Sequence, residues 1–76
     1  MNTKYMTAQE TYELYAKENA KNPNSDDAKL LHKMIYLTKV FRYLDGDILE
    51  EARIQRNAAI RLWNETHDSL KIIEPF

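Results

Sequence analysis

The stretch from Ala28 to Leu44 is apolar on almost every side when it is wound as an α-helix. Its main seam repeats at intervals of three or four residues and consists of Leu30, Met34, Leu37, Phe41 and Leu44, widened by Leu31, Ile35 and Thr38. Val40 flanks this seam, and the far side carries Tyr36 and Tyr43 beside polar residues. A helix that is apolar nearly all round needs cover on more than one side. We therefore predict that this segment is the central helix of a small helical protein, covered by neighbours on two faces or by a second chain on one.

The length of 76 residues allows one domain, residues 1–76. A chain this short buries only about 60% of the surface of its unfolded form, so a single core is marginal. Disulfide bonds and thiolate metal sites are excluded because the sequence has no cysteine, and its two histidines lack ligand spacing. Oligomerisation is the remaining source of stability, so we expect a homo-oligomer or a complex with another protein. A compact monomer is the alternative.

Charge and hydropathy exclude several classes of protein. Eleven basic residues face twelve acidic ones, and the net charge of −1 argues against non-specific binding of nucleic acid. No stretch approaches the roughly 18 apolar residues of a membrane span. The first five residues do not resemble a secretory signal, since no apolar run follows their positive charge. With the lack of cysteine, these features favour a cytoplasmic location.

Capping signals predict three helices, over residues 8–20, 26–45 and 48–68. Thr7 and Glu10 fit a capping box, and Ser25 fits an N-cap. Gly46 is placed where a helix ends in the left-handed conformation, and Asp47 would cap the next helix. Strand signals are absent. The predicted fold is all-α: an antiparallel hairpin of the second and third helices with the first helix folded against it, a small three-helix bundle.

The third helix is expected to bury one apolar face, which comprises Ile48, Ala52, Ala59, Trp63, Thr66 and Leu70. Ala52 and Ala59 would let the backbone approach the second helix closely. Trp63 would fill the wider space beyond them, so we expect this side chain to be essential for stability.

An aromatic face is the first candidate site. It combines residues opposite the main seam of the second helix with residues of the first: Tyr36, Tyr43, His32, Lys39, Tyr12 and Tyr15. One interpretation is that the first helix lies on this face and the rings pack together. The other is that some rings stay exposed as a surface for a protein partner, since tyrosine is enriched in interfaces. A nucleobase stacked on tyrosine beside Lys39 and Arg42 is a narrower version.

A second candidate is an anion site along one edge of the third helix, formed by Arg53, Arg56, Trp63 and His67. Guanidinium groups bind phosphate or carboxylate, and an aromatic ring offers a stacking surface. The alternative is that these residues form salt bridges with acidic residues such as Asp26, Asp27, Asp45 or Asp47. Arg56 lies only about 40° from the centre of the apolar face, which favours pairing or a stem extended along the surface.

Arg61 and His67 resemble the arginine and histidine of helical ribonucleases of the HEPN type, in which the arginine stabilises phosphate charge and the histidine transfers a proton. The resemblance covers two residues, which lie about 120° apart on a helix. We expect no cofactor, no metal and no catalysis. The favoured function is a small binding or regulatory protein that docks a helical face onto another protein, by analogy with phage- and plasmid-encoded inhibitors of host systems.

Overall fold

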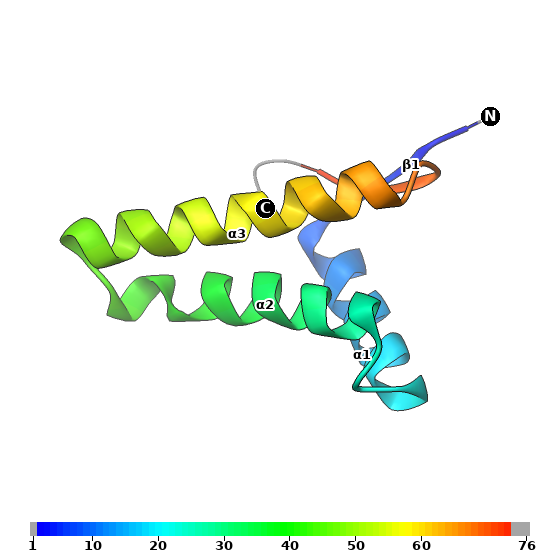
Figure 1. The fold of residues 1–76 in the computed structure, drawn as a ribbon, viewed down its shortest axis with the longest axis horizontal. Coiled ribbons are helices and arrows are strands. Elements are labelled where there is room, and N and C mark those ends of the chain that lie inside the picture. The colour runs from blue at the N-terminus through cyan, green and yellow to red at the C-terminus, as the bar shows by residue number, and fades with distance from the viewer. Residues whose placement is uncertain (1, 74–76) are drawn as a thin grey trace.

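The computed structural model of the protein describes residues 2–73. The chain forms six elements: β1 (Lys4–Met6), α1 (Ala8–Lys21), α2 (Asp26–Val40), the 3₁₀ turn η1 (Phe41–Tyr43), α3 (Gly46–Thr66) and β2 (Leu70–Ile72) (Figure 1). The protein is mostly helical and has three helices, as predicted, and it also contains a small two-stranded parallel sheet. No helix within residues 2–73 combines the length and the apolar character needed to cross a membrane.

The starts of α1 and α2 follow the predicted capping chemistry. The Thr7 side chain accepts a hydrogen bond from the Glu10 amide, and the Glu10 carboxylate accepts one from the Thr7 amide. At α2 the Ser25 hydroxyl accepts from the Ala28 amide at 3.1 Å, and Asp26 and Asp27 occupy the first turn. These bonds satisfy amides that the helices leave unpaired.

The connection between α2 and α3 differs from the prediction. The second helix does not continue to Asp45: it ends at Val40, tightens into η1 and becomes extended at Leu44. The third helix starts two residues early, at Gly46, and its N-cap is Asp45 rather than Asp47. Gly46 does adopt the left-handed conformation, with φ of 57°, but it opens α3 instead of ending α2. A 3₁₀ turn followed by the two extended residues Leu44 and Asp45 reverses the chain between α2 and α3.

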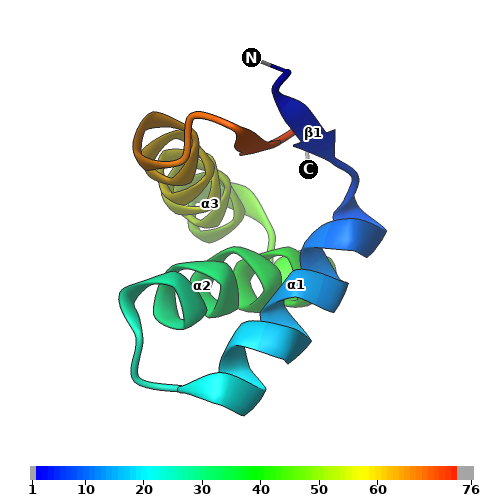
Figure 2. The ribbon, with the colours of Figure 1, turned by 90° about the vertical axis from the view of Figure 1, so that its right-hand side faces the viewer.

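The α2 and α3 helices lie side by side, and in Figure 1 the chain runs to the left along α2 and returns to the right along α3. The α1 helix is arranged differently. Figure 2 shows it crossing α2 rather than lying along its length. Tyr15 of α1 contacts His32, and the Tyr12 ring lies 5.9 Å from the Lys39 ammonium. The rings of Tyr36 and Tyr43 stay exposed all the same.

The expected absence of strands was wrong. The β1 and β2 strands pair in parallel, with Met6 opposite Ile72, and both of these side chains are buried. Consequently α3 ends at Thr66 instead of residue 68, and Leu70 belongs to β2 instead of the helix. Three-residue strands are too short for an alternating pattern to be recognised, which explains the error.

The main core lies where α2, α3 and the sheet meet. Its buried members are Met6, Leu31, Met34, Ala59, Ile60, Trp63 and Ile72. Trp63 is buried as predicted, and its indole N–H donates to the Leu70 carbonyl at 2.9 Å. Ile48, which was expected on the buried face of the third helix, is instead 66% exposed. The core is therefore concentrated at one end of the α2–α3 pair.

Candidate binding groove

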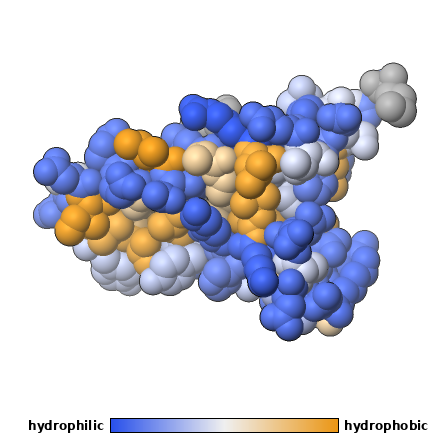
Figure 3. Space-filling view, viewed as in Figure 1, coloured by the Kyte–Doolittle hydropathy of each residue, from blue (hydrophilic) through white to orange (hydrophobic). Residues whose placement is uncertain are grey.

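The other end of the α2–α3 pair carries an open groove with a volume of about 780 Å³. Its apolar lining comes from α2, η1, Leu44 and α3, and comprises Tyr36, Leu37, Val40, Tyr43, Leu44, Ile48 and Ala52. Three of these side chains are largely in water: Tyr36 is 56% exposed, Tyr43 72% and Ile48 66%. Figure 3 shows one hydrophobic patch near the middle of the molecule and hydrophobic surface at this end of it. We call this surface the groove face.

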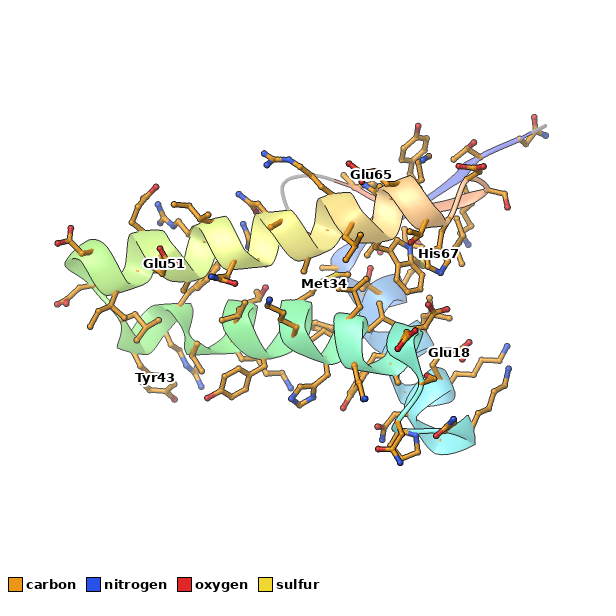
Figure 4. All side chains as sticks on the ribbon, in the orientation of Figure 1. Glu18, Met34, Tyr43, Glu51, Glu65 and His67 are labelled. Carbon is orange, nitrogen blue, oxygen red and sulfur yellow. The ribbon has the colours of Figure 1, made fainter. Side chains whose placement is uncertain are left out.

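Helix periodicity places the α3 residues of the groove face on one side. Ile48, Glu51, Ala52 and Gln55 follow the spacing of successive turns, so they form one stripe. On the opposite side, Tyr36 and Tyr43 form a ridge that also borders a second, smaller hollow with Lys39 and Arg42. Figure 4 shows Tyr43 and Glu51 at the same end of the molecule, one from η1 and the other from α3.

The two edges of the groove face carry opposite charges. Asp47 and Glu51 lie along the α3 edge, whereas Lys39 and Arg42 lie beyond the tyrosine ridge on the α2 side. None of these four side chains forms a salt bridge with a residue in the described range 2–73. Lys39 lies 5.9 Å from the Tyr12 ring, and Arg42 lies 4.9 Å from the Tyr43 ring. Both cations therefore sit beside aromatic rings and have no carboxylate partner among those residues.

The remaining residues of the predicted aromatic face are engaged within the chain. The Tyr15 hydroxyl lies 3.1 Å from Nδ1 of His32, and the His32 ring stacks on Tyr36 with centroids 6.0 Å apart. Tyr12 is half-buried beneath Lys39. The structure thus divides the face: Tyr12 and Tyr15 of the first helix contact α2 side chains, and the rings of Tyr36 and Tyr43 stay exposed.

His67 occupies a different place from the groove face. Its ring lies flat on the Trp63 indole, with centroids 3.7 Å apart and planes 3° apart. Nε2 lies 3.1 Å from Oδ2 of Asp27, while Nδ1 lies 3.0 Å from the Trp63 carbonyl and 2.9 Å from the Thr66 hydroxyl. Both ring nitrogens have hydrogen-bonding partners, so His67 joins the end of α3 to the start of α2.

The candidate anion residues are not gathered into one pocket. Arg53 is exposed, whereas Arg56 is buried, with its guanidinium 4.7 Å from the Phe41 ring and its Nε donating to the Asn57 side chain. Trp63 offers no free stacking surface because it is buried and His67 covers it. Arg53 on α3 and His67, the C-cap of that helix, are 14 residues apart, which corresponds to about 21 Å along the helix axis.

The two residues suggested by the ribonuclease resemblance, Arg61 and His67, also differ in their surroundings. Arg61 is exposed on α3, and both nitrogens of His67 are occupied by the contacts to Asp27, Trp63 and Thr66. A general acid or base needs a nitrogen within reach of substrate. Within residues 2–73, no three histidine, aspartate or glutamate side chains come together as a metal site.

Sequence reasoning did not predict that the groove would be open. Leu37 and Leu44 were assigned to the buried seam of the second helix, and Ile48 to the buried face of the third, whereas Ala52 is buried as expected. The spacing of Ile48 and Ala52 showed that they share a face, but not that Ile48 lies beyond the core. Comparisons of the chain with protein-family models, curated proteins and solved structures find no match.

Proposed function

We propose that this protein is a non-catalytic binding module that docks onto another polypeptide chain through the groove face. The observation that carries the proposal is the clustering of Tyr36, Tyr43 and Ile48 around one apolar groove, all three more than half exposed. Isolated exposed apolar residues are common, but a contiguous patch with a polar rim is typical of an interaction surface.

The chemistry of the groove face suits a helical protein partner. Its floor is aliphatic, its ridge is aromatic, and its edges are charged, which is the usual anatomy of an interface with an apolar centre and a polar rim. Grooves between two helices bind amphipathic helices through apolar side chains three or four residues apart. The proposed partner surface therefore presents such a helical stripe.

The alternative of anion binding has less support. The four residues proposed for an anion site do not form one site: Arg53, Arg56, Trp63 and His67. Two of them, Arg56 and Trp63, are buried. Lys39 and Arg42 do lie near tyrosine rings, but the apolar groove on the other side of that ridge is larger. A surface that binds another protein accounts for both the apolar groove and the cations beside the tyrosine rings.

Site-specific photocrosslinking tests the proposal. A benzophenone amino acid replacing Tyr43 would be compared with the same amino acid replacing Tyr5, which is 57% exposed but lies on β1. We expect the probe at position 43, and not the probe at position 5, to form a covalent adduct of defined mass with a bound polypeptide chain. We expect this adduct to be lost when Ile48→Glu is added. Equal labelling at both positions, no adduct at position 43, or an adduct that persists in the Ile48→Glu variant would contradict the proposal.

A further inference from the structure

We propose that the chain bound at the groove face is a second copy of this protein, related by a two-fold axis that runs parallel to α2 and α3. This inference rests on the proposed function and names its partner. In the resulting dimer each groove covers the other, and the four long helices form one bundle with a continuous apolar centre. Homodimers with two-fold symmetry use the same surface on both copies, so that surface must complement itself.

Charge is the first reason to choose a second copy. Across the groove face the order is basic edge, tyrosine ridge, aliphatic floor and acidic edge: Lys39 and Arg42 on one side, Asp47 and Glu51 on the other. Each edge carries two charges of one sign. An arrangement that places unlike edges together pairs all four side chains of each copy, and opposite potentials across an interface stabilise one orientation over others.

The orientation of the axis follows from this order. A two-fold axis parallel to the helices places the α2 edge of each copy against the α3 edge of the other, so Lys39 and Arg42 face Asp47 and Glu51. An axis perpendicular to the helices within the interface would place α2 on α2 and would oppose like charges. Like charges facing each other disfavour association, so the first arrangement is selected.

The position of the core is the second reason. Its buried cluster, from Met6 to Ile72, lies at the end of α2 and α3 where α1 and the sheet cover them, whereas the groove end is open. A domain of this length gains limited stability from one core, and association is a common remedy. A second copy would cover Tyr36, Leu37 and Ile48 at the end that the chain's own elements leave open.

Charge reversal combined with sedimentation velocity tests the arrangement. The wild-type chain should be a reversible dimer with twice the chain mass of 9.0 kDa. The Lys39→Glu/Arg42→Glu variant has two acidic edges, and the Asp47→Lys/Glu51→Lys variant has two basic edges. Each variant alone should dimerise at least about 10-fold more weakly, and an equimolar mixture should regain wild-type association as a heterodimer.

Matched apolar variants provide the control for folding. Ile48→Glu places a charge in the groove face, whereas Ile54→Glu makes the same change at another exposed position of α3, outside the groove. The first should weaken the dimer at least about 10-fold and the second should leave it unchanged. Circular dichroism should show the same helical content for both.

The outcomes separate this inference from the proposed function. A wild-type chain that stays monomeric up to about 1 mM, or a mixture that does not regain association, overturns the dimer. If the chain is monomeric but the photocrosslinker at position 43 yields an Ile48-dependent adduct with a different protein, the proposed function stands and only the second copy is excluded. A monomer without any such adduct contradicts both.

Discussion

The imidazole of His67 lies flat on the indole of Trp63, with ring centroids 3.7 Å apart and planes 3° apart. Beneath this stack the Trp63 N–H donates to the Leu70 carbonyl, and beside it His67 contacts Asp27. Three segments therefore meet at Trp63: the end of α3, the start of α2 and the β2 strand. The stability of the whole fold is expected to depend on this side chain.

Trp63→Ala should abolish cooperative unfolding at room temperature. Truncating a buried tryptophan costs about 3–5 kcal/mol, which is comparable to the stability that one core supplies in a domain of this size. Far-ultraviolet circular dichroism during urea titration would measure the loss. Leu62→Ala, at an exposed position one residue earlier, is the control and should unfold like the wild type. A cooperative transition for Trp63→Ala with an unchanged midpoint would contradict the packing described here.

The contact between His67 and Asp27 should show a measurable coupling. The imidazole can donate to Asp27 through Nε2 and to the Trp63 carbonyl through Nδ1 when both nitrogens are protonated. The side chains are partly exposed, so we expect a coupling free energy of about 0.5–1 kcal/mol. A double-mutant cycle with His67→Phe and Asp27→Asn in urea unfolding would measure it. Strictly additive effects would show that the two side chains do not stabilise each other.

Asn64 closes the edge of β2 that faces α3. Its side-chain oxygen accepts from the Ile72 amide at 2.8 Å, and its side-chain nitrogen donates to the Ile72 carbonyl at 3.1 Å. Asn64→Asp keeps the acceptor but replaces the donor with a second oxygen, which would repel the carbonyl. We expect both Asn64→Asp and Asn64→Ala to destabilise the fold by about 1–2 kcal/mol.

Hydrogen exchange distinguishes these two changes. The Ile72 amide should exchange faster in Asn64→Ala, where its acceptor is lost, than in Asn64→Asp, where an acceptor remains. Equal exchange rates in the wild type and Asn64→Ala would mean that the side chain does not hold the strand.

The ion pair between Lys4 and Glu10 should make the β1–α1 junction sensitive to pH. Lys4 Nζ lies 2.7 Å from Glu10 Oε2, and hydrogen bonds from Lys4 and then from the Thr7 amide lower the pKa of Glu10 below its usual range. The hydrogen bond to Glu10 in turn raises the pKa of Lys4.

The sign of each contribution follows from these shifts. Stability from Glu10 is fully present above the pKa of a glutamate in the unfolded chain, and it is lost as the pH falls through the lowered pKa. Stability from Lys4 is present below the unfolded lysine pKa and is lost as the pH rises through the raised one. Melting temperature measured against pH should therefore fall less steeply in acid for Glu10→Gln than for the wild type. Glu65→Gln on α3 is the control, and identical acid profiles for Glu10→Gln and the wild type would contradict the assignment.

Local chemistry explains which parts of the fold could be predicted. The capping box at Thr7 and the N-cap at Ser25 involve residues three apart, so sequence alone identified the starts of α1 and α2. The β1–β2 pairing joins segments more than 60 residues apart, such as Met6 and Ile72. Each strand has three residues, and no local pattern encodes such a partner.

The candidate site was predictable only in part. Periodicity placed Tyr36 and Tyr43 on one side of the predicted second helix, but two interpretations fitted that side. The packing of α1 on α2 decides between them, since Tyr15 pairs with His32 while the Tyr43 ring stays in water. The place where the core ends along α3 depends likewise on the packing of β2, so the exposure of Ile48 could not be read from its spacing.

The most direct test of the groove face is the mass in solution of Tyr36→Glu/Tyr43→Glu, measured by light scattering beside its circular dichroism spectrum. Because both rings are exposed, the account predicts a variant with wild-type helical content that has lost the association shown by the wild-type chain. A variant that loses its helical structure would show that the rings pack the fold, and one that associates like the wild type would show that the groove face is not a binding surface.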